Sequence, residues 1–156
     1  MKKNKIFTII IIIIVLILVL FIGIKYFLTE KQNSQEIEED VISYNDMIKV
    51  FQPLNNKTIS SPLNIQGEAR GNWFFEASFP IKMIDENGKE IPLNINYITT
   101  DKEWFTEDYI SFSEKITFDK PDTKNGTLIL KKANPSGMPE KEEKLEIPIK
   151  FKANLN

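Results

Sequence analysis

The stretch GEARGNWFFEASFPI, residues 67–81, decides how this chain of 156 residues folds. It places Arg70, the only arginine in the sequence, between two glycines. After this turn-like segment, apolar side chains recur at every second position, and such alternation predicts a strand with one buried face. The stretch therefore predicts a turn that leads into the central strand of a sheet, with Phe75, Ala77 and Phe79 facing the core.

The same alternation recurs along the chain, interrupted by residues that favour turns. The predicted strands cover residues 48–51, 63–70, 75–83, 91–97, 110–118, 127–131 and 145–151. Pro148 cannot donate a backbone hydrogen bond, so we expect it at a sheet edge or a bulge. The pattern predicts an all-β, immunoglobulin-like β-sandwich of about seven strands over residues 48–156. We expect one N-terminal transmembrane helix to precede this sandwich. The aromatic residues expected to anchor its core are Phe75, Phe79, Phe112, Phe118 and Phe151.

The N-terminal segment predicts a membrane anchor. From Ile6 to Ile24 the sequence is almost wholly apolar, and a helix of this length spans about 28 Å, close to the hydrocarbon core of a bilayer. A cleaved signal peptide is the alternative, but the apolar run is long and no small-residue cleavage pattern follows it. Three lysines precede the run, which predicts residues 1–5 in the cytoplasm, a helix over residues 6–25, and the rest of the chain outside.

Residues 26–47 are polar and acidic, without a sustained apolar period. This composition predicts a flexible, solvated tether between the helix and the sandwich. Such a tether would keep the sandwich near the outer face of the cell membrane while leaving it free to reorient.

The composition excludes several classes of function. The sequence has no cysteine and no histidine, so cysteine–histidine and serine–histidine catalysis, the usual zinc sites and disulfides are absent. Four lysines lie in or beside the first segment, which leaves 16 basic against 22 acidic residues elsewhere. This balance disfavours a nucleic-acid partner. We predict a non-catalytic protein with no catalytic residues, cofactor or metal.

Four side chains are candidates for contact with a ligand or partner: Arg70, Trp73, Phe74 and Trp104. Arg70 could fork onto a carboxylate such as Glu68 or Glu76 and pin the turn to the strand, or it could receive an acidic ligand. The three aromatic residues could cap the ends of the sandwich core, or they could form an exposed patch for a glycan or protein. We favour an architectural role for the residues of this turn, including Arg70. Trp73 and Phe74 are the strongest candidates for contact with a partner instead.

One loop loosely suggests a calcium site, because several oxygen-bearing side chains occur close together there. These residues are Asp119, Asp122 and Asn125, followed by Gly126. Their spacing lacks the EF-hand pattern and its closing bidentate glutamate, so the sequence favours a solvated turn.

Several of these motifs together resemble a known family. They are residues 61–71, residues 73–81, the turn at 85–88, WFTED at 104–108 with Phe112, and the NPSG loop at 134–137. Over residues 48–151 the chain resembles the immunoglobulin-like domain associated with bacterial spore germination, the Gmad type. The resemblance implies an extracytoplasmic all-β domain of a bacterial envelope protein, and it supplies no catalytic residues.

The sequence thus favours a single-pass protein that displays an interaction module outside the cell membrane. Its expected contacts are the bilayer, through Ile6 to Ile24, and an envelope protein. The alternatives are an accessory protein that binds cell-wall carbohydrate and a passive spacer in a membrane complex.

Overall fold

The computed structural model describes residues 16–25 and 41–152, which belong to two separate compact units divided between residues 38 and 39. In the first unit, residues 16–25 are helical. Within the described residues, no helix is both long enough and apolar enough to cross a bilayer. Residues 1–5, the first ten residues of the predicted span, and residues 26–40 of the predicted tether lie outside the described parts of the chain.

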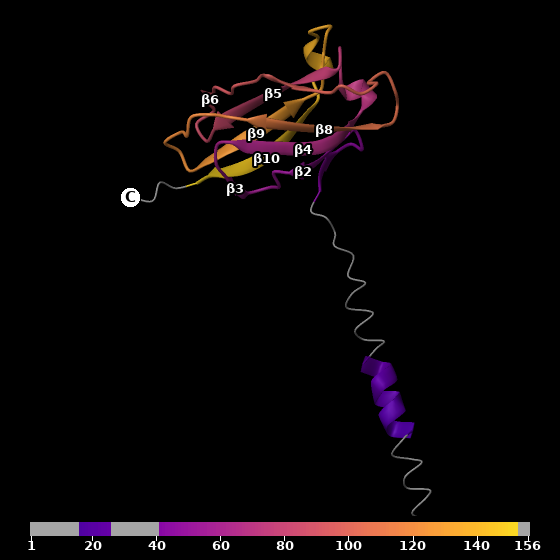
Figure 1. Cartoon of the computed structure of the whole chain (residues 1–156). Coiled ribbons are helices and arrows are strands. Elements are labelled where there is room, and N and C mark those ends of the chain that lie inside the picture. Colours follow the sequence, from indigo (N-terminus) through magenta and orange to yellow (C-terminus); the bar gives the residue numbers. More distant parts are fainter. Residues whose placement is uncertain (1–15, 26–40, 153–156) are drawn as a thin grey trace, which may run out of the picture. The chain divides into compact units, whose positions relative to one another are not determined.

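Residues 41–152 form two stacked sheets (Figure 1). The strands are β1 (Ile42–Tyr44), β2 (Ile48–Gln52), β3 (Lys57–Ile59), β4 (Leu63–Arg70), β5 (Ser78–Asp85), β6 (Glu90–Ile91), β7 (Tyr97–Thr99), β8 (Tyr109–Ile116), β9 (Asn125–Lys131) and β10 (Lys144–Phe151). Two short 3-10 turns, η1 (Gly71–Trp73) and η2 (Pro139–Lys141), complete the regular structure. The predicted all-β sandwich is confirmed, with three more short strands than the alternation indicates.

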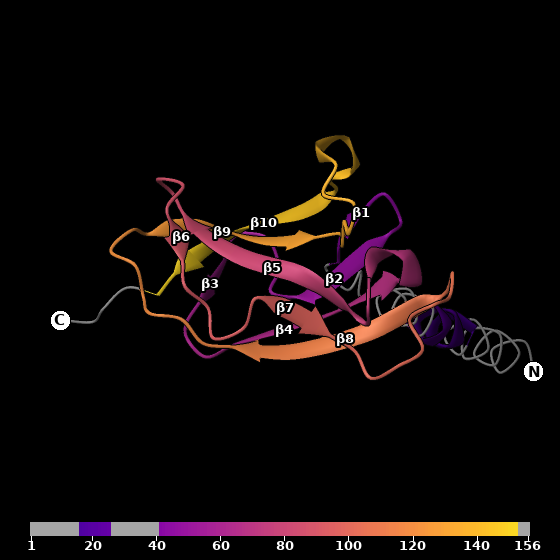
Figure 2. The same ribbon diagram turned by 90° about the horizontal axis from the view of Figure 1, so that it is seen from above.

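One sheet has the order β1-β2-β4-β8, and the other has the order β3-β10-β9-β5-β6, with β7 also pairing β5. Figure 2 shows the long strands running along the domain, so that the loops gather at its two ends. β4 and β8 pair over eight residues each, from Leu63 opposite Ile116 to Arg70 opposite Tyr109. The end of the sheet at Arg70 and Tyr109 is the end that carries the candidate site.

The core lies between the sheets and is built from the alternating positions of the strands. β4 and β10 bury every second residue, as their sequences predict. Among the expected anchors, four are buried: Phe79, Phe112, Phe118 and Phe151. Burying each of these side chains is worth on the order of 1.5–3 kcal/mol. Phe75, the fifth, is instead 42% exposed.

Phe75 is exposed because the predicted strand begins three residues later than the alternation suggests. Glu76 and Ala77 have φ angles of 49° and 57°, and the backbone groups of Phe75 and Ser78 form two mutual hydrogen bonds. This is a two-residue hairpin turn with both central residues in the left-handed region. The turn breaks the period, so the prediction that Phe75 and Ala77 face the core is wrong.

This turn predicts a stabilising substitution. A left-handed residue other than glycine is strained by roughly 1–2 kcal/mol, and Asn-Gly is the pair that such turns favour. We expect Glu76→Asn with Ala77→Gly to raise the free energy of unfolding by about 1 kcal/mol, after the added chain entropy of glycine is subtracted. Thermal unfolding should show a melting temperature higher by about 4 °C. Glu76→Gln is the control and should leave it unchanged; a lower melting temperature for the double variant would contradict this account of the turn.

Three other predictions about the strands need correction. Residues 42–47 were predicted as part of the tether, but β1 pairs with β2 and its turn is part of the sheet. The single strand predicted at 91–97 is two short strands, β6 and β7, since Pro92 lacks the N–H that a continuous ladder needs. Pro148 lies within β10, between β3 and β9, and its carbonyl accepts a hydrogen bond from Asn56 N on the β3 side. Its nitrogen faces that same side, so the ladder with β9 is intact.

Candidate functional site

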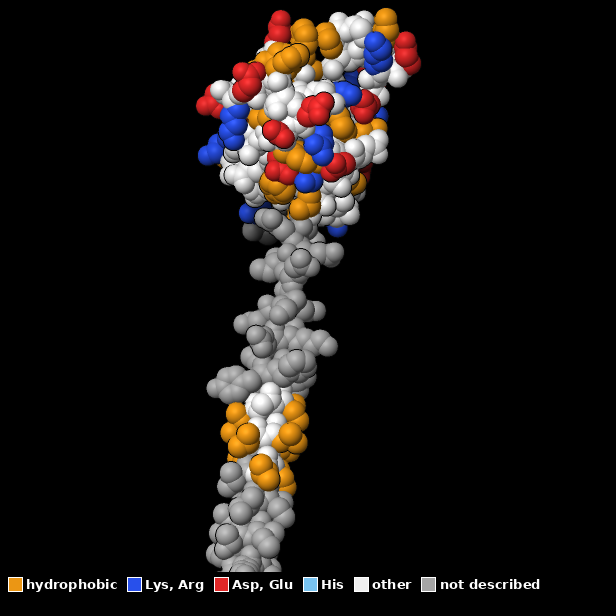
Figure 3. Space-filling view, turned by 90° about the vertical axis from the view of Figure 1, so that its right-hand side faces the viewer, with side chains coloured by type: hydrophobic (Ala, Val, Ile, Leu, Met, Phe, Trp, Pro, Cys, Tyr) orange, Lys and Arg blue, Asp and Glu red, His pale blue; other side chains and the backbone are white. Residues whose placement is uncertain are grey.

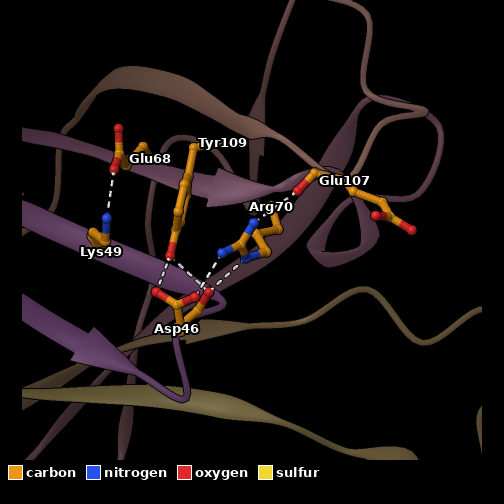
Figure 4. A network of polar contacts seen from close by, with 6 residues as sticks. All are labelled: Asp46, Lys49, Glu68, Arg70, Glu107 and Tyr109. Carbon is orange, nitrogen blue, oxygen red and sulfur yellow. Dashed lines mark hydrogen bonds and ion pairs between the residues drawn. The ribbon is translucent and has the colours of Figure 1, made fainter.

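The guanidinium of Arg70 joins three segments at one end of the sandwich (Figure 4). Its Nη2 donates to Asp46 Oδ2 over 2.6 Å, and its Nε donates to the Asp46 carbonyl over 2.9 Å. Its Nη1 donates to the carbonyl of Glu107 over 3.0 Å. Arg70 therefore ties the β1–β2 turn and the loop before β8 to the end of β4. This supports the architectural role, but the carboxylate is Asp46 and not the nearby Glu68 or Glu76.

Tyr109 completes this network. Its hydroxyl lies 2.6 Å from Asp46 Oδ1 and 2.7 Å from the Asp46 carbonyl oxygen. Figure 4 shows its ring edge-on between Lys49 and Arg70, whose charged groups lie 4.0 and 4.4 Å from the ring centroid. Lys49 Nζ also pairs with Glu68 over 3.1 Å. Each of the two cations therefore has a carboxylate partner and a face of the same ring.

The contacts of Asp46 set its protonation. Hydrogen bonds from the Tyr109 hydroxyl and the Arg70 guanidinium hold the pKa of Asp46 below its usual value. Burial and the hydrogen bond to Asp46 raise the pKa of Tyr109, and the pairing with Asp46 raises the pKa of Arg70. At neutral pH Asp46 is therefore an ionised carboxylate, Tyr109 a neutral phenol and Arg70 a charged guanidinium.

The lowered pKa of Asp46 predicts a pH-dependent contribution to stability. A carboxyl group has an unfolded pKa of about 3.9, so near that pH the unfolded chain takes up the proton first. Asp46 then stabilises the fold fully above about pH 4, and the contribution is lost as the pH falls through the folded pKa. We expect the melting temperature of the natural chain to exceed that of Asp46→Asn at pH 6, and the difference to shrink below pH 4. Asp122→Asn, in a loop at the opposite end, controls for the loss of one charge; a gap that is constant with pH would contradict the assignment.

Trp73 and Phe74, both predicted as possible contact residues, lie in the core. Trp73 in η1 is fully buried, and its ring packs edge-on against Tyr44 with centroids 6.0 Å apart. Phe74 packs against Phe79 at 5.1 Å. Neither offers an exposed ring to a partner. Their burial supports the alternative interpretation, in which they cap one end of the sandwich core.

Trp104, the fourth candidate, is half-buried and belongs to a surface group of rings. Its ring contacts Phe75 at 6.2 Å and Phe105 at 5.9 Å between centroids. Phe105 is 85% exposed. We call Phe75, Trp104 and Phe105 the aromatic cluster. It joins the hairpin before β5 to the loop before β8, two segments that are about 30 residues apart in the sequence.

A cavity of about 300 Å³ opens beside this cluster. We call it the end cavity; its lining residues are Gly71, Asn72, Trp104, Phe105, Thr106 and Glu107. Figure 3 views this end of the domain and shows hydrophobic side chains at the surface among acidic and basic ones. The floor depends on Gly71, where a Cβ atom would lie 2.1 Å from the carbonyl oxygen of Thr106. The missing side chain thus lets the loop before β8 pack directly on η1.

The loose calcium pattern is not gathered into a site. Asn125 Nδ2 donates to Glu86 Oε2 over 2.9 Å, and Gly126 lies in β9 opposite Asp85. Among residues 16–25 and 41–152, no three histidine, cysteine, aspartate or glutamate side chains are placed to hold a metal ion.

The sequence interpretation missed three residues of this end of the domain: Asp46, Tyr109 and Phe105. Asp46 lies within the range predicted as tether, although Asn45-Asp46 just before a strand is a turn signal. Tyr109 precedes the predicted strand at 110–118 by one residue. Phe105 directly follows Trp104 in a loop. Because only one of two adjacent residues can face the core in an alternating strand, this pair of aromatic residues is a signal that one ring is exposed.

Comparison with known proteins gives a family for the domain. A family model described as the immunoglobulin-like domain of bacterial spore germination, Gmad2, matches residues 47–139. Searches of curated proteins and of solved structures return no match. The matched residues include β2, β4, the aromatic cluster and the whole end cavity. Because the match covers more than half of the chain, this protein belongs to the Gmad2 family of immunoglobulin-like domains.

Proposed function

We propose that this protein is a non-catalytic interaction module, anchored in the cell membrane and displayed outside it, whose partner docks at the end cavity. The observation that carries the proposal is the exposed aromatic cluster beside that cavity. Phe105 leaves 85% of its surface in water, and Phe75 leaves 42%. Exposed aromatic side chains rimmed by polar residues are typical of protein interaction sites, and anchor residues of this type dominate binding energy.

The scaffold beneath the cluster is suited to recognition. Arg70 fixes the loop before β8 by its bond to the Glu107 carbonyl, and Gly71 lets the same loop pack closely. Binding residues on loops that a rigid sheet supports lose less conformational entropy when a partner arrives. The end cavity therefore has a fixed wall from η1 and an accessible wall from Phe105.

The membrane anchor in this proposal rests on the sequence. The apolar run from Ile6 to Ile24 is long enough to span a bilayer, and lysines precede it. Fractionation of cells that produce the full chain with a C-terminal tag tests it. The tag should stay with membranes after an alkaline wash and be cleaved by protease added to intact protoplasts. A tagged product that is released in soluble form, or is protected from the protease, would contradict the anchor or its orientation.

The geometry of the rings favours a protein partner over cell-wall glycan. Sugar rings stack on flat aromatic faces, which calls for rings in similar planes. Here Phe75 and Trp104 are inclined at 65°, and Trp104 and Phe105 at 85°. Such edge-to-face rings enclose a side chain more readily than they support a saccharide chain.

Site-specific photo-crosslinking in living cells tests the proposed docking site. A photoreactive phenylalanine is introduced at position 105, at position 75, or at position 97. Tyr97 is also an exposed aromatic residue, at 54%, but it belongs neither to the aromatic cluster nor to the lining of the end cavity, so it serves as the matched control. We expect one discrete adduct with the same partner from positions 105 and 75, and none from position 97.

Each other outcome points to another function. A ladder of adducts that collapses after digestion with a wall hydrolase would favour glycan binding. No adduct at any position, in a chain that still folds and reaches its location, would favour a passive spacer. Equal adducts from position 97 would contradict docking at the end cavity.

A further inference from the structure

The negative charge of the domain is concentrated beside the end cavity. Residues 101–108 carry four acidic side chains and one lysine: Asp101, Glu103, Glu107 and Asp108 against Lys102. Residues 41–152 together hold 17 acidic and 15 basic side chains, so this loop accounts for the whole net negative charge of the domain. All five side chains of the loop are exposed.

The two cations on the ring of Tyr109, Lys49 and Arg70, are each paired with a carboxylate outside the loop. Arg70 is paired with Asp46 at 2.6 Å, and it contacts the loop through the carbonyl of Glu107 and not through the carboxylate. Figure 4 shows the Glu107 side chain extending away from Arg70. Glu107 is one of the residues that line the end cavity and its side chain is exposed, so its carboxylate is available to a group that enters from solvent.

Aromatic rings and carboxylates together select for a cation. The face of an aromatic ring carries partial negative charge and attracts ammonium and guanidinium groups, most strongly in tryptophan. Trp104 and Phe105 provide such rings in the end cavity, and Glu107 provides a full negative charge beside them. An anionic ligand such as a phosphate polymer would meet like charge here, so the same features disfavour it.

The size of the end cavity limits the occupant to a small group. Its volume of about 300 Å³ is at the lower limit for pockets that take whole small molecules. One long side chain fits this volume, with the rest of the partner remaining outside on the rim of the loop. The aliphatic stem of lysine or arginine would cover the rings while the charged head reaches Glu107.

We propose that the end cavity binds a lysine or arginine side chain from a basic segment of the partner protein. This inference rests on the proposed function, because it names the group that enters the site where the partner docks. Phe105 and Trp104 contact the stem and the cation, Glu107 pairs with the charged head, and Glu103 and Asp101 attract the basic segment to the loop.

Binding of synthetic peptides to the full-length chain in detergent tests the inference. The probe is a short peptide that alternates glycine with lysine, and the matched control alternates glycine with glutamine. Tryptophan fluorescence reports binding, because Trp73 is fully buried and Trp104 lies on the cavity. We expect the lysine peptide to bind about ten-fold more tightly than the glutamine peptide.

Three variants and one control separate the contribution of the ring from that of the charge. Phe105→Ala removes an exposed ring and should weaken the lysine peptide by about ten-fold. Glu103→Gln with Glu107→Gln should weaken it several-fold, whereas Asp119→Asn with Asp122→Asn, the same change of charge at the opposite end, should not. Lys102→Gln removes the one like charge in the loop and should tighten binding about two-fold.

Equal binding of the two peptides would overturn the cationic occupant, and so would an unchanged affinity in Phe105→Ala. Either result can be told apart from failure of the proposed function. Photo-crosslinking at positions 105 and 75 measures docking of the cellular partner whatever its chemistry. If the adduct forms there while the lysine peptide fails to bind selectively, only the cationic occupant is wrong.

Discussion

Phe79→Ala is expected to lower the free energy of unfolding by about 3–5 kcal/mol, the range for removing a buried phenylalanine ring. Phe79 is fully buried in β5 and packs edge-on against two further rings, Phe74 at 5.1 Å and Phe112 at 5.2 Å. Phe74 directly follows η1, whereas Phe79 lies in β5 of one sheet and Phe112 lies in β8 of the other, so the three rings connect the two sheets. Alanine at position 79 would leave a cavity between the two sheets, and the neighbouring side chains are held too firmly by their own strands to fill it.

Urea unfolding of the full chain, followed by near-ultraviolet circular dichroism, measures this change. The midpoint should fall strongly while the slope with denaturant stays constant, because the surface exposed on unfolding is nearly the same. The melting temperature should fall by roughly 10–20 °C. Phe105→Ala is the matched control, since its ring is 85% exposed and its loss should change the melting temperature little. A loss below about 1 kcal/mol for Phe79→Ala would contradict the central place of Phe79 in the core.

Gly71→Ala is expected to have the second largest effect, because it affects both the fold and the end cavity. The new Cβ would lie 2.1 Å from Thr106 O and 2.2 Å from Trp104 O. Both are backbone atoms, so no change of rotamer can relieve the overlap. The loop before β8 must move away from η1, at a cost of about 1–3 kcal/mol for an overpacked site.

Hydrogen exchange locates this effect. Amide protons of the loop, including the Thr106 N–H that is bonded to the Trp104 carbonyl, should exchange faster in Gly71→Ala. Peptide binding at the end cavity should fall with it. Asn72→Ala is the control for the exchange measurement alone, since Asn72 is exposed and lies one residue further along the same turn but also lines the end cavity. Unchanged exchange in the loop would show that η1 does not set its position.

Much of the sandwich could be predicted because its long strands have one buried face. β4 and β10 bury alternate residues, β8 does so except at Glu114, and that pattern is visible in the sequence. β1 was missed because three residues beside an acidic segment are too short for a period. The start of β5 was misplaced because Glu76 and Ala77 continue the alternation, and neither residue type signals a left-handed turn.

The candidate site was only partly predictable, because its residues meet through the register of the strands. Arg70 was recognised by its flanking glycines, but its partner Asp46 is 24 residues earlier and meets it only once β2 pairs with β4. Trp104 was recognised by residue type. The exposure of Phe105, and the burial of Trp73, depend on how the loop before β8 lies over η1, which no local pattern describes.

The bonds of Arg70 also determine how the domain would carry mechanical force. Asp46 is at the tip of the β1–β2 turn, and Glu107 belongs to the wall of the end cavity. If the proposed partner is held in that cavity, tension applied at residue 41 passes through β1 and Asp46 before it reaches Arg70. Both the β1–β2 backbone bonds and the Asp46–Arg70 pair lie on this path. Under such tension β1 would be held by the ion pair beyond its end as well as by the pairing of its own three residues.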